Sequence, residues 1–318
     1  MSEDAKGFDV DWLALREPLD RDARAATGLD DRIAAWLDGR RGGGSDRGAA
    51  GSPAGTVSIV DLGCGSGSNL RHLLPRLGAG QRWRVVDNDR ALLRALGERL
   101  DAWAKAHGAT VEATPDGELG VRGDGFDATV TRERRDLAAD LTGPGGLGLA
   151  GTDLVTASAL LDLCSADWID ALVEACARAG AAGLFVLDYD GGARWDPPHA
   201  DDERVRALVN RHQRRDKGFG PARGPAAGAH AAARLTLAGH DVVAATSVWR
   251  VGSDSAALHA AFVDGWARAA TELAPDEAER IEAWRAHRVA AAGAGGATLE
   301  VSHHDVLALP PGGHEEAL

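Results

Sequence analysis

The stretch VSIVDLGCGSGSNLRHLL, residues 57–74, restricts the possible folds of this chain more than any other segment. Its β-branched run ends at Asp61, and three glycines follow at alternate positions, Gly63, Gly65 and Gly67, before a leucine-rich helical pattern begins. Glycine adopts backbone angles that other residues avoid, and its missing Cβ lets a ligand lie against the main chain. The stretch therefore predicts a buried strand, a tight turn and a helix, with a small ligand at the turn.

Short β-branched runs alternate with amphipathic helical patterns through the middle of the chain. The predicted strands cover residues 57–61, 83–87, 127–137, 153–157 and 183–188, and the predicted helices cover residues 69–77, 91–107 and 167–179. Strands that alternate with helices imply right-handed crossovers and a parallel sheet covered on both faces. We therefore expect an α/β fold, doubly wound and Rossmann-like.

The segments on either side of this core are helical or low in complexity. Residues 9–38 have apolar side chains at helical spacing, and GRRGGGSDRGAAGSPAG after them is typical of a linker. Beyond the core, the pattern predicts helices at 201–214 and before 239, a strand at 241–251, two helices within 255–292 and a strand at 297–307. We expect an N-terminal helical segment with a Gly-rich linker over 1–55, one domain over 56–310 with a helical insertion at 252–296, and a tail over 311–318.

The charge balance and the cysteines argue against several functional classes. Acidic residues outnumber basic ones by 48 to 35, for a net charge of −13, so nucleic acid and anionic membranes would be repelled. The three cysteines, Cys64, Cys164 and Cys176, lack the CxxC spacing of a zinc site and are too few for a disulfide framework. His303 and His304 are adjacent in a predicted strand and would point to opposite faces, so we expect no metal site. The polar N-terminus and the lack of an apolar run near ~18 residues lead us to expect a cytoplasmic protein without a membrane span.

Two acids at the ends of successive strands narrow the identity of the ligand at the glycine turn. The dinucleotide fingerprint GxGxxG would need glycine at position 68, where this chain has Ser68. A pyrophosphate tolerates a nearby acid poorly, whereas Asp61 suits a ligand with a cationic amine. Asp87 ends the next strand, where a carboxylate can accept hydrogen bonds from both hydroxyls of a ribose. Together the two acids predict an aminoacyl nucleoside.

At this point the chain resembles the class I S-adenosylmethionine-dependent methyltransferases over most of residues 56–310. VDLGCGSG is similar to the first motif of that family, and RRDLAADL and DLVTASALLDL resemble its third-strand and fourth-strand motifs. The resemblance implies S-adenosylmethionine as the cofactor. It also implies a seven-stranded sheet in which an antiparallel last strand lies between the fifth and sixth strands.

The resemblance further implies a role for each matching residue. Asp61 would order the amino group of the methionine moiety, the turn of Gly63, Gly65 and Gly67 would approach the cofactor, and Asp87 would bind the ribose. The other implied contacts are Asn88 beside the adenine, Asp136 at the adenine amino group, Leu137 through its backbone amide, and Ala157 and Ser158 along the methionine moiety. Asp136 equally suits a helix cap and Ser158 a crowded strand end, so both interpretations stay open.

The sequence indicates the residues that would bind the methyl acceptor less clearly than those that would bind the cofactor. Three residues, Asp188, Tyr189 and Asp190, end the fifth predicted strand, where an acceptor or a general base would lie, although acids also commonly begin loops there. Aromatic residues in and beside the insertion are candidates for a lid over the acceptor: Trp249, Phe262, Trp266 and Trp284.

The best-supported hypothesis is an enzyme, an S-adenosylmethionine-dependent methyltransferase that transfers a methyl group to a small-molecule acceptor by in-line displacement. Such a transfer mainly requires that two reactants be held in line and kept from water. The sequence therefore leaves open the acceptor, its reacting atom, the use of a general base and the oligomeric state. Two alternatives remain: an NAD(P)-dependent Rossmann oxidoreductase, and a non-catalytic S-adenosylmethionine-binding protein.

Overall fold

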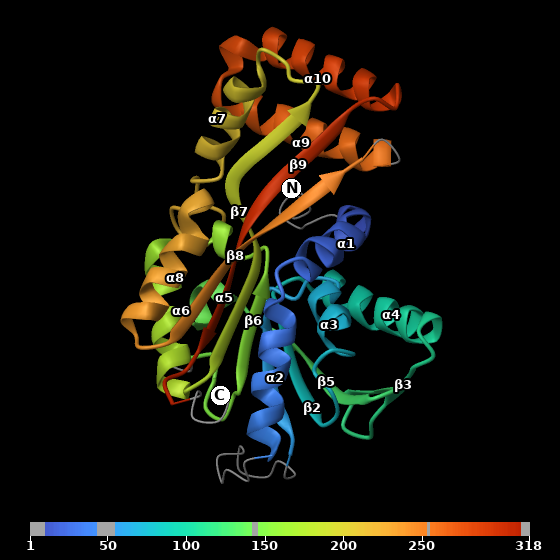
Figure 1. The fold of residues 1–318 in the computed structure, drawn as a ribbon, viewed down its shortest axis with the longest axis vertical. Helices are drawn as coiled ribbons and strands as arrows, with labels where there is room; N and C mark the ends of the chain where they lie inside the picture. Colours follow the sequence, from blue (N-terminus) through green and yellow to red (C-terminus); the bar gives the residue numbers. More distant parts are fainter. Residues whose placement is uncertain (1–9, 43–54, 142–145, 253–254, 313–318) are drawn as a thin grey trace.

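The computed structural model describes residues 10–42, 55–141, 146–252 and 255–312. Within these residues, one mixed sheet of nine strands runs through the molecule, and helices cover both of its faces (Figure 1). Most of the predicted Gly-rich linker and of the predicted C-terminal tail lies outside the described residues. None of the described helices combines the length and the apolar character needed to cross a bilayer.

Five parallel strands form the centre of the sheet. In spatial order they are β5 (Phe126–Arg134), β2 (Gln81–Asp87), β1 (Val57–Leu62), β6 (Leu154–Ser158) and β7 (Ala182–Asp196). The direction of winding reverses between β1 and β6, because β2 and β5 extend the sheet to one side and β6 and β7 to the other. This order confirms the doubly wound α/β fold. Ligands of such sheets bind beyond the carboxyl ends of the strands at the reversal.

The last two strands complete one edge of the sheet as predicted. β9 (Thr298–Leu309) lies between β7 and β8 (Asp241–Val251) and pairs antiparallel with both. The antiparallel last strand between the fifth and the sixth is therefore confirmed. The predicted helical insertion is also present, because α9 (Ala256–Leu273), the short 3-10 turn η4 (Pro275–Glu277) and α10 (Ala278–Gly293) join β8 to β9.

The expectation of seven strands was wrong, because a hairpin adds two strands beside β5. β3 (Thr110–Ala113) and β4 (Leu119–Gly123) pair antiparallel with each other, and β4 pairs antiparallel with β5. Of the hairpin's strand residues only Val121 is buried. A strand at a solvated edge carries little apolar patterning, so the sequence contains no clear signal for it.

Two strand ends also differ from the predicted ones. β5 stops at Arg134 instead of continuing to 137, because Asp136 caps the short helix α5 (Leu137–Asp140). β7 continues well past 188, because it keeps pairing with β9 across two register shifts. As a result, Asp188, Tyr189 and Asp190 do not end the strand, as predicted, but lie in the middle of the long β7–β9 ladder.

A hydrophobic core lies on each face of the sheet, and alternate residues of the central strands point into one or the other. Ile59 and Leu184 belong to the first core, and Val60 and Phe185 belong to the second. The first is covered by helices that include α3 (Ser68–Leu73) and α4 (Arg90–Ala106), and the second by α6 (Ala166–Ala179), α8 (Ala227–Leu237) and α5 (Figure 1). The short 3-10 turns η1 (Leu161–Leu163) and η2 (Gly224–Ala226) contact each other and β7.

The N-terminal helices pack on the first core. α1 (Val10–Ala25) and α2 (Leu29–Gly42) are separated by a tight turn in which Gly28 has a φ of +69°. The buried side chains of Leu29, Ile33 and Leu37 join α2 to the core. The N-terminal segment is therefore part of the same folded unit as the sheet.

A helical layer covers the part of the sheet where the C-terminal ends of β7 and β8 lie beside the N-terminal end of β9. It consists of α7 (Asp202–His212), α9 and α10, which lie together at the top of the molecule in Figure 1. Trp195 of β7 packs edge-on against Trp266 of α9 and Trp284 of α10, with ring centroids 5.1 and 5.4 Å apart. α9 thereby shares a cavity with Ala159, which directly follows β6, and with Tyr189 of β7.

Candidate functional site

The glycine turn follows β1 at the switch point of the sheet. Gly63, Gly65 and Gly67 have φ values of +63°, +52° and +84°, which only glycine adopts without strain. A Cβ at Gly67 would lie 2.8 Å from Leu96 Cγ, and one at Gly63 would lie 3.1 Å from Leu160 Cδ1. The turn therefore needs glycine both for its backbone angles and for close contact with α4 and with the segment after β6.

Asp61 lies at the base of this turn with an unsatisfied oxygen. Its side chain is fully buried, and Oδ1 accepts a hydrogen bond from Asn69 Nδ2 at 2.8 Å. Oδ2 is buried and has no hydrogen-bond partner among the described residues. Burial raises the pKa of Asp61 to about 7. Because a buried oxygen without a donor is costly, the arrangement suits a ligand that brings a cationic donor.

Asp87 ends β2 and joins the glycine turn to the next helix. Its Oδ2 accepts from the backbone amide of Gly65 at 2.9 Å, and its Oδ1 accepts from the amide of Asp89, the N-cap of α4, at 2.9 Å. Burial raises the pKa of Asp87. Each carboxylate oxygen can accept a second hydrogen bond, so both remain able to receive a hydroxyl.

The other residues predicted to hold a cofactor lie along the same edge. Asn88 is exposed directly after Asp87, and Asp136 is exposed after β5, where it accepts from the amide of Ala138 at 3.0 Å. Leu137 is buried beside it. Ala157 is buried at the end of β6, and Ser158 is half-buried after it. The helix-cap interpretation of Asp136 is therefore present in the structure, and one of its carboxylate oxygens is left for another partner.

Helix α1 lies over the glycine turn. Leu13 Cδ1 would lie 3.5 Å from a Cβ at Gly65. Arg71 of α3 holds α1 through a two-pronged ion pair with Glu17, at 2.9 and 2.6 Å, and donates to the carbonyl of Ser66 at 2.6 Å. The turn is thus covered by α1 and held by a hydrogen bond from α3.

A buried polar chain continues from Asp61 into the N-terminal helices. Arg24 of α1 donates to Asn69 Oδ1 at 2.6 Å and to Asp30 Oδ1 at 2.7 Å. His72 Nε2 lies 2.7 Å from the other oxygen of Asp30. The orientation of Asn69, and through it that of Asp61, therefore depends on a helix far away in the sequence.

A cavity of about 710 Å³ lies beside the turn, past Ala159 at the end of β6. Its walls come from α1, β7, β8, β9, α7, α9 and the segment after β6. The aromatic part of the lining comprises Trp12, Tyr189, Trp249, Phe262 and Trp266. Three of the four predicted lid residues line this cavity. The fourth, Trp284, does not line it, because it is fully buried against α7, where its Nε1 donates to Asp202 at 2.9 Å.

The structure separates the three acceptor-side candidates at the fifth predicted strand. Tyr189 lines the cavity and donates its hydroxyl to Asn210 at 2.8 Å. Asp188 is buried behind the cavity and accepts from the amide of Leu161 at 2.8 Å. Asp190 accepts from Ser302 Oγ at 2.6 Å and does not line the cavity.

Asp162 is an acid of the cavity that the sequence analysis missed. It lies in η1, near the end of the stretch DLVTASALLDL, and is only 6% exposed. Its Oδ1 is buried without a hydrogen-bond partner in the described part of the chain. Burial raises the pKa of Asp162. A single acid inside the leucine-rich run ALLDLC was the available signal.

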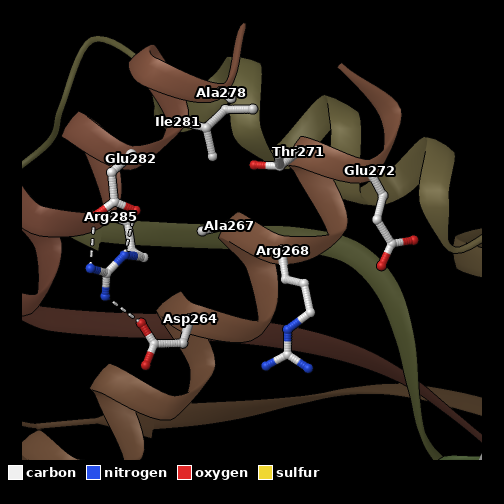
Figure 2. A pocket seen from close by; sticks show the side chains of 9 residues that line it. All are labelled: Asp264, Ala267, Arg268, Thr271, Glu272, Ala278, Ile281, Glu282 and Arg285. Carbon is white, nitrogen blue, oxygen red and sulfur yellow. Dashed lines mark hydrogen bonds and ion pairs between the residues drawn. The ribbon is translucent and has the colours of Figure 1, made fainter. Parts of the chain in front are cut away.

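A second hollow, of about 670 Å³, lies between α9 and α10 (Figure 2). Arg285 spans it and pairs with Glu282 and with Asp264, both at 2.8 Å. All of its lining residues belong to these two helices and none to the carboxyl edge of the sheet. It is not part of the candidate site.

Metal-ligating groups do not gather in the described residues. No cluster of three or more histidine, cysteine or acidic side chains there could hold a metal ion. His303 lines the cavity, whereas the side chain of His304 faces Gly228 of α8 on the opposite side of the sheet. All three cysteines are free and buried.

Comparisons with known proteins give only distant similarities. No protein-family model and no curated protein matches the sequence. Among solved structures, the chain is similar to a cyclopropane synthase from Mycobacterium tuberculosis, with 12% identity, coverage of 81% of this chain and 79% of the other, and a TM-score of 0.38. An arsenic(III) S-adenosylmethionine methyltransferase from Chlamydomonas reinhardtii has 17% identity, 80% and 64% coverage and a TM-score of 0.38. An S-adenosylmethionine-dependent methyltransferase from Geobacter sulfurreducens, solved with S-adenosylhomocysteine, has 17% identity, 89% and 90% coverage and a TM-score of 0.37.

These TM-scores are all below 0.5, so the likenesses do not decide the activity of this chain. The case for a function depends on the residues at the carboxyl edge of the sheet.

Proposed function

We propose that this protein is an S-adenosylmethionine-dependent methyltransferase that acts on a small-molecule acceptor. The observation that carries the proposal is the unsatisfied, buried Oδ2 of Asp61 at the base of a turn with three positive-φ glycines. A second acid, Asp87, stands across the same turn at the end of β2. An ammonium group and a ribose are the groups that such a pair of acids would hold.

The residues present fit this cofactor. Asp61 would receive the amino group of the methionine moiety, Asp87 the ribose hydroxyls, and the turn of Gly63, Gly65 and Gly67 would lie against the cofactor because no Cβ intervenes. The adenine would meet Asn88, Asp136 and Leu137, and the methionine moiety would meet Ala157 and Ser158. When bound, the cofactor supplies an electrophilic methyl group on a sulfonium.

The chain's own residues would position the two reactants and exclude water. The cavity past Ala159 adjoins the glycine turn, because the neighbouring Leu160 lies so near Gly63 that a Cβ there would be 3.1 Å from Leu160 Cδ1. Leu13 and Trp12 of α1 cover the turn and the cavity respectively. Holding an acceptor in line with a methyl group in such an enclosed space accounts for much of the rate of a displacement.

The same geometry argues against a nicotinamide dinucleotide. A pyrophosphate binds best at the free N-terminus of a helix, where backbone amides and the helix dipole attract it. Here α3 has only six residues, and the side chain of Asp61 is buried at the base of the turn. A carboxylate at that place would repel a pyrophosphate.

Calorimetric titration with S-adenosylmethionine, S-adenosylhomocysteine and NADH tests the proposal. We expect both sulfur compounds to bind and NADH not to bind. Asp87→Asn should weaken binding at least ~10-fold, since a hydrogen bond to a charged group contributes roughly 1.5–3 kcal/mol. Asp116→Asn, at an exposed position in the β3–β4 turn, is the matched control and should bind like the wild type. Failure of the wild type to bind either sulfur compound would refute the proposal.

Turnover separates an enzyme from a non-catalytic binding protein. The protein is incubated with a cell extract and S-adenosylmethionine labelled in its methyl group. We expect the label to appear in the small-molecule fraction. Label confined to nucleic acid or protein would exclude a small-molecule acceptor, and tight binding without any transfer would favour the non-catalytic alternative.

A further inference from the structure

We propose that the acceptor is an aromatic hydroxyl compound and that the carboxylate of Asp162 takes the hydroxyl proton as the methyl group is transferred. This inference rests on the proposed methyltransferase function and specifies the acceptor class of the same site. It is carried by the lining of the cavity, the unsatisfied oxygen of Asp162 and the charges that face this residue.

The cavity offers aromatic walls to a ligand that carries a ring. Five aromatic side chains line it, and Trp266 stands between Tyr189 and Phe262, with ring centroids 6.2 and 4.9 Å away. Aromatic walls favour edge-to-face and offset contacts with another ring. A volume of about 710 Å³ lies within the range of pockets that enclose a small molecule.

Among the polar residues that line the cavity, Asp162 is the nearest in sequence to Leu160, the residue that packs against the glycine turn. It is two residues after Leu160 and three after Ala159, which lines the cavity. Its Oδ1 lacks a hydrogen-bond donor among the described residues, although the residue is almost completely buried. An acceptor with an O–H or N–H group would supply the missing donor.

Cations on two other elements decide between a hydroxyl and an amine. Arg16 of α1 and Lys217, in the segment after α7, both line the cavity and attract the Asp162 carboxylate. Two positive charges would stabilise the negative charge that grows on a hydroxyl oxygen and would repel an ammonium group. Arg16 is held in place by Asp20, at 3.0 Å, and its guanidinium lies 5.4 Å from the ring centroid of Trp249.

The histidines and the cysteine near Asp162 do not compete for this role. Lys217 Nζ lies 3.3 Å from His212 Nδ1, and burial lowers the pKa of His212. Burial also lowers the pKa of His303 to about 4, so this ring is neutral at pH 7. The Cys164 thiol stays protonated, because burial raises its pKa well above the usual value.

Asp188 acts on Asp162 as a positioning residue. Burial, and then the charge of Asp162, raise the pKa of Asp188 well above its usual value. Its Oδ1 accepts from the amide of Leu161 and so holds the turn η1 that presents Asp162. Of these two acids, Asp162 lines the cavity and Asp188 does not, so Asp162 is the one that can receive a proton from the acceptor.

The step balances without any further reactant. The hydroxyl proton passes to the Asp162 carboxylate, and the acceptor oxygen forms a bond to the methyl carbon. The bond between that carbon and the sulfonium sulfur breaks, and its electron pair stays on sulfur. The products are an aryl methyl ether, S-adenosylhomocysteine and a protonated Asp162, which then loses its proton to water.

The test uses phenols of one to three rings, the matching arylmethylamines and the matching aryl methyl ethers, each with labelled S-adenosylmethionine. We expect labelled ethers from one or more phenols and no transfer to the amines or ethers. Asp162→Asn should lower the rate ~100-fold or more, as general-base catalysis typically contributes, with the affinity for S-adenosylmethionine unchanged. Asp167→Asn, exposed at the start of α6, is the matched control and should keep the full rate.

A pH profile distinguishes a base from a structural role. At S-adenosylmethionine concentrations that saturate the site at every pH, the wild-type rate should fall on the acid side of a pKa above the ordinary aspartate value of about 4, and this limb should disappear in Asp162→Asn. If the wild type binds S-adenosylmethionine, any of three results would overturn the inference. These are transfer to amines alone, no transfer to any phenol, and a full rate in Asp162→Asn. If the wild type binds no S-adenosylmethionine, the proposed function itself fails and the inference fails with it.

Discussion

Arg24 of helix α1 donates to the side-chain oxygen of Asn69 at 2.6 Å, and the amide nitrogen of Asn69 donates to Asp61 at 2.8 Å. Asn69 is therefore the one side chain between Arg24 of the N-terminal helix and Asp61 at the base of the glycine turn. All three residues are buried, so each depends on the others for its hydrogen bonds. Folding of the N-terminal segment and assembly of the candidate cofactor site are thus coupled.

Removal of Arg24 should destabilise the whole protein. Arg24→Met leaves Asp30 and Asn69 buried without their donor, and loss of one partner of a buried pair costs roughly 3–5 kcal/mol. Urea unfolding measures this change in the free energy of unfolding. Arg21→Met, on the same helix but at an exposed ion pair, should change it by less than ~0.5 kcal/mol. Equal stability of the two variants would contradict the coupling.

Binding of S-adenosylmethionine should weaken as the pH falls from 7 to 5. Burial raises the pKa of Asp61 to about 7, so below this pH the free protein holds a neutral acid that cannot pair with an ammonium group. The ligand favours the charged form, so binding releases a proton there, and the affinity should fall up to tenfold per pH unit. Above pH 7 the carboxylate is already charged and this dependence ends.

The control for this titration is Asp61→Asn, which has the same size and no titrating proton. Its binding should be weaker, and the steep dependence between pH 5 and 7 should disappear. Calorimetry in two buffers of different ionisation enthalpy counts the proton released. A pH dependence equally steep in both proteins would assign the titration to another group.

Substitutions of Asp136 should separate its cap from its proposed contact with adenine. Asp136→Ser keeps a side-chain oxygen for the amide of Ala138 and should unfold at the wild-type temperature, whereas Asp136→Ala should lose about 1 kcal/mol of stability. Both variants lose the second carboxylate oxygen and should bind S-adenosylmethionine about fivefold more weakly, the value of one hydrogen bond. Wild-type affinity in Asp136→Ser would mean that this residue is only a cap.

The glycine turn should tolerate a methyl group poorly at Gly67. Gly67→Ala combines a φ of +84° with a Cβ 2.8 Å from Leu96 Cγ. Gly117→Ala has a similar φ of +81° but no atom within 4 Å of the new Cβ, so it measures the backbone strain alone. We expect Gly67→Ala to be the less stable by roughly 1–3 kcal/mol, the usual cost of overpacking. Thermal unfolding of the two variants makes the comparison, and equal losses would show that α4 moves aside.

The strands around the glycine turn could be predicted because their signals are local. A β-branched run that ends in an acid before spaced glycines encodes strand and turn within about a dozen residues, and Asp61 is part of it. Asp87 follows in the same way from the acid that ends the next predicted strand, at 83–87. The β3–β4 hairpin carried no comparable signal, because one of its faces meets solvent and its strands bury little. The extension of β7 beyond 188 could not be predicted from local sequence either, because it depends on pairing with β9, which follows more than a hundred residues later.

The sequence by itself determined the doubly wound sheet and the acids of the glycine turn, because periodicity and spacing act over neighbouring residues. The antiparallel last strand was implied by the resemblance to a known family. Only the tertiary structure decided the acceptor cavity. Trp12, Asp162, Lys217 and Phe262 come from four distant segments, and only packing brings them together. Burial then changes what they do: Asp162 becomes an unsatisfied acid in a cavity, while Trp284, equally aromatic in the sequence, becomes part of the core.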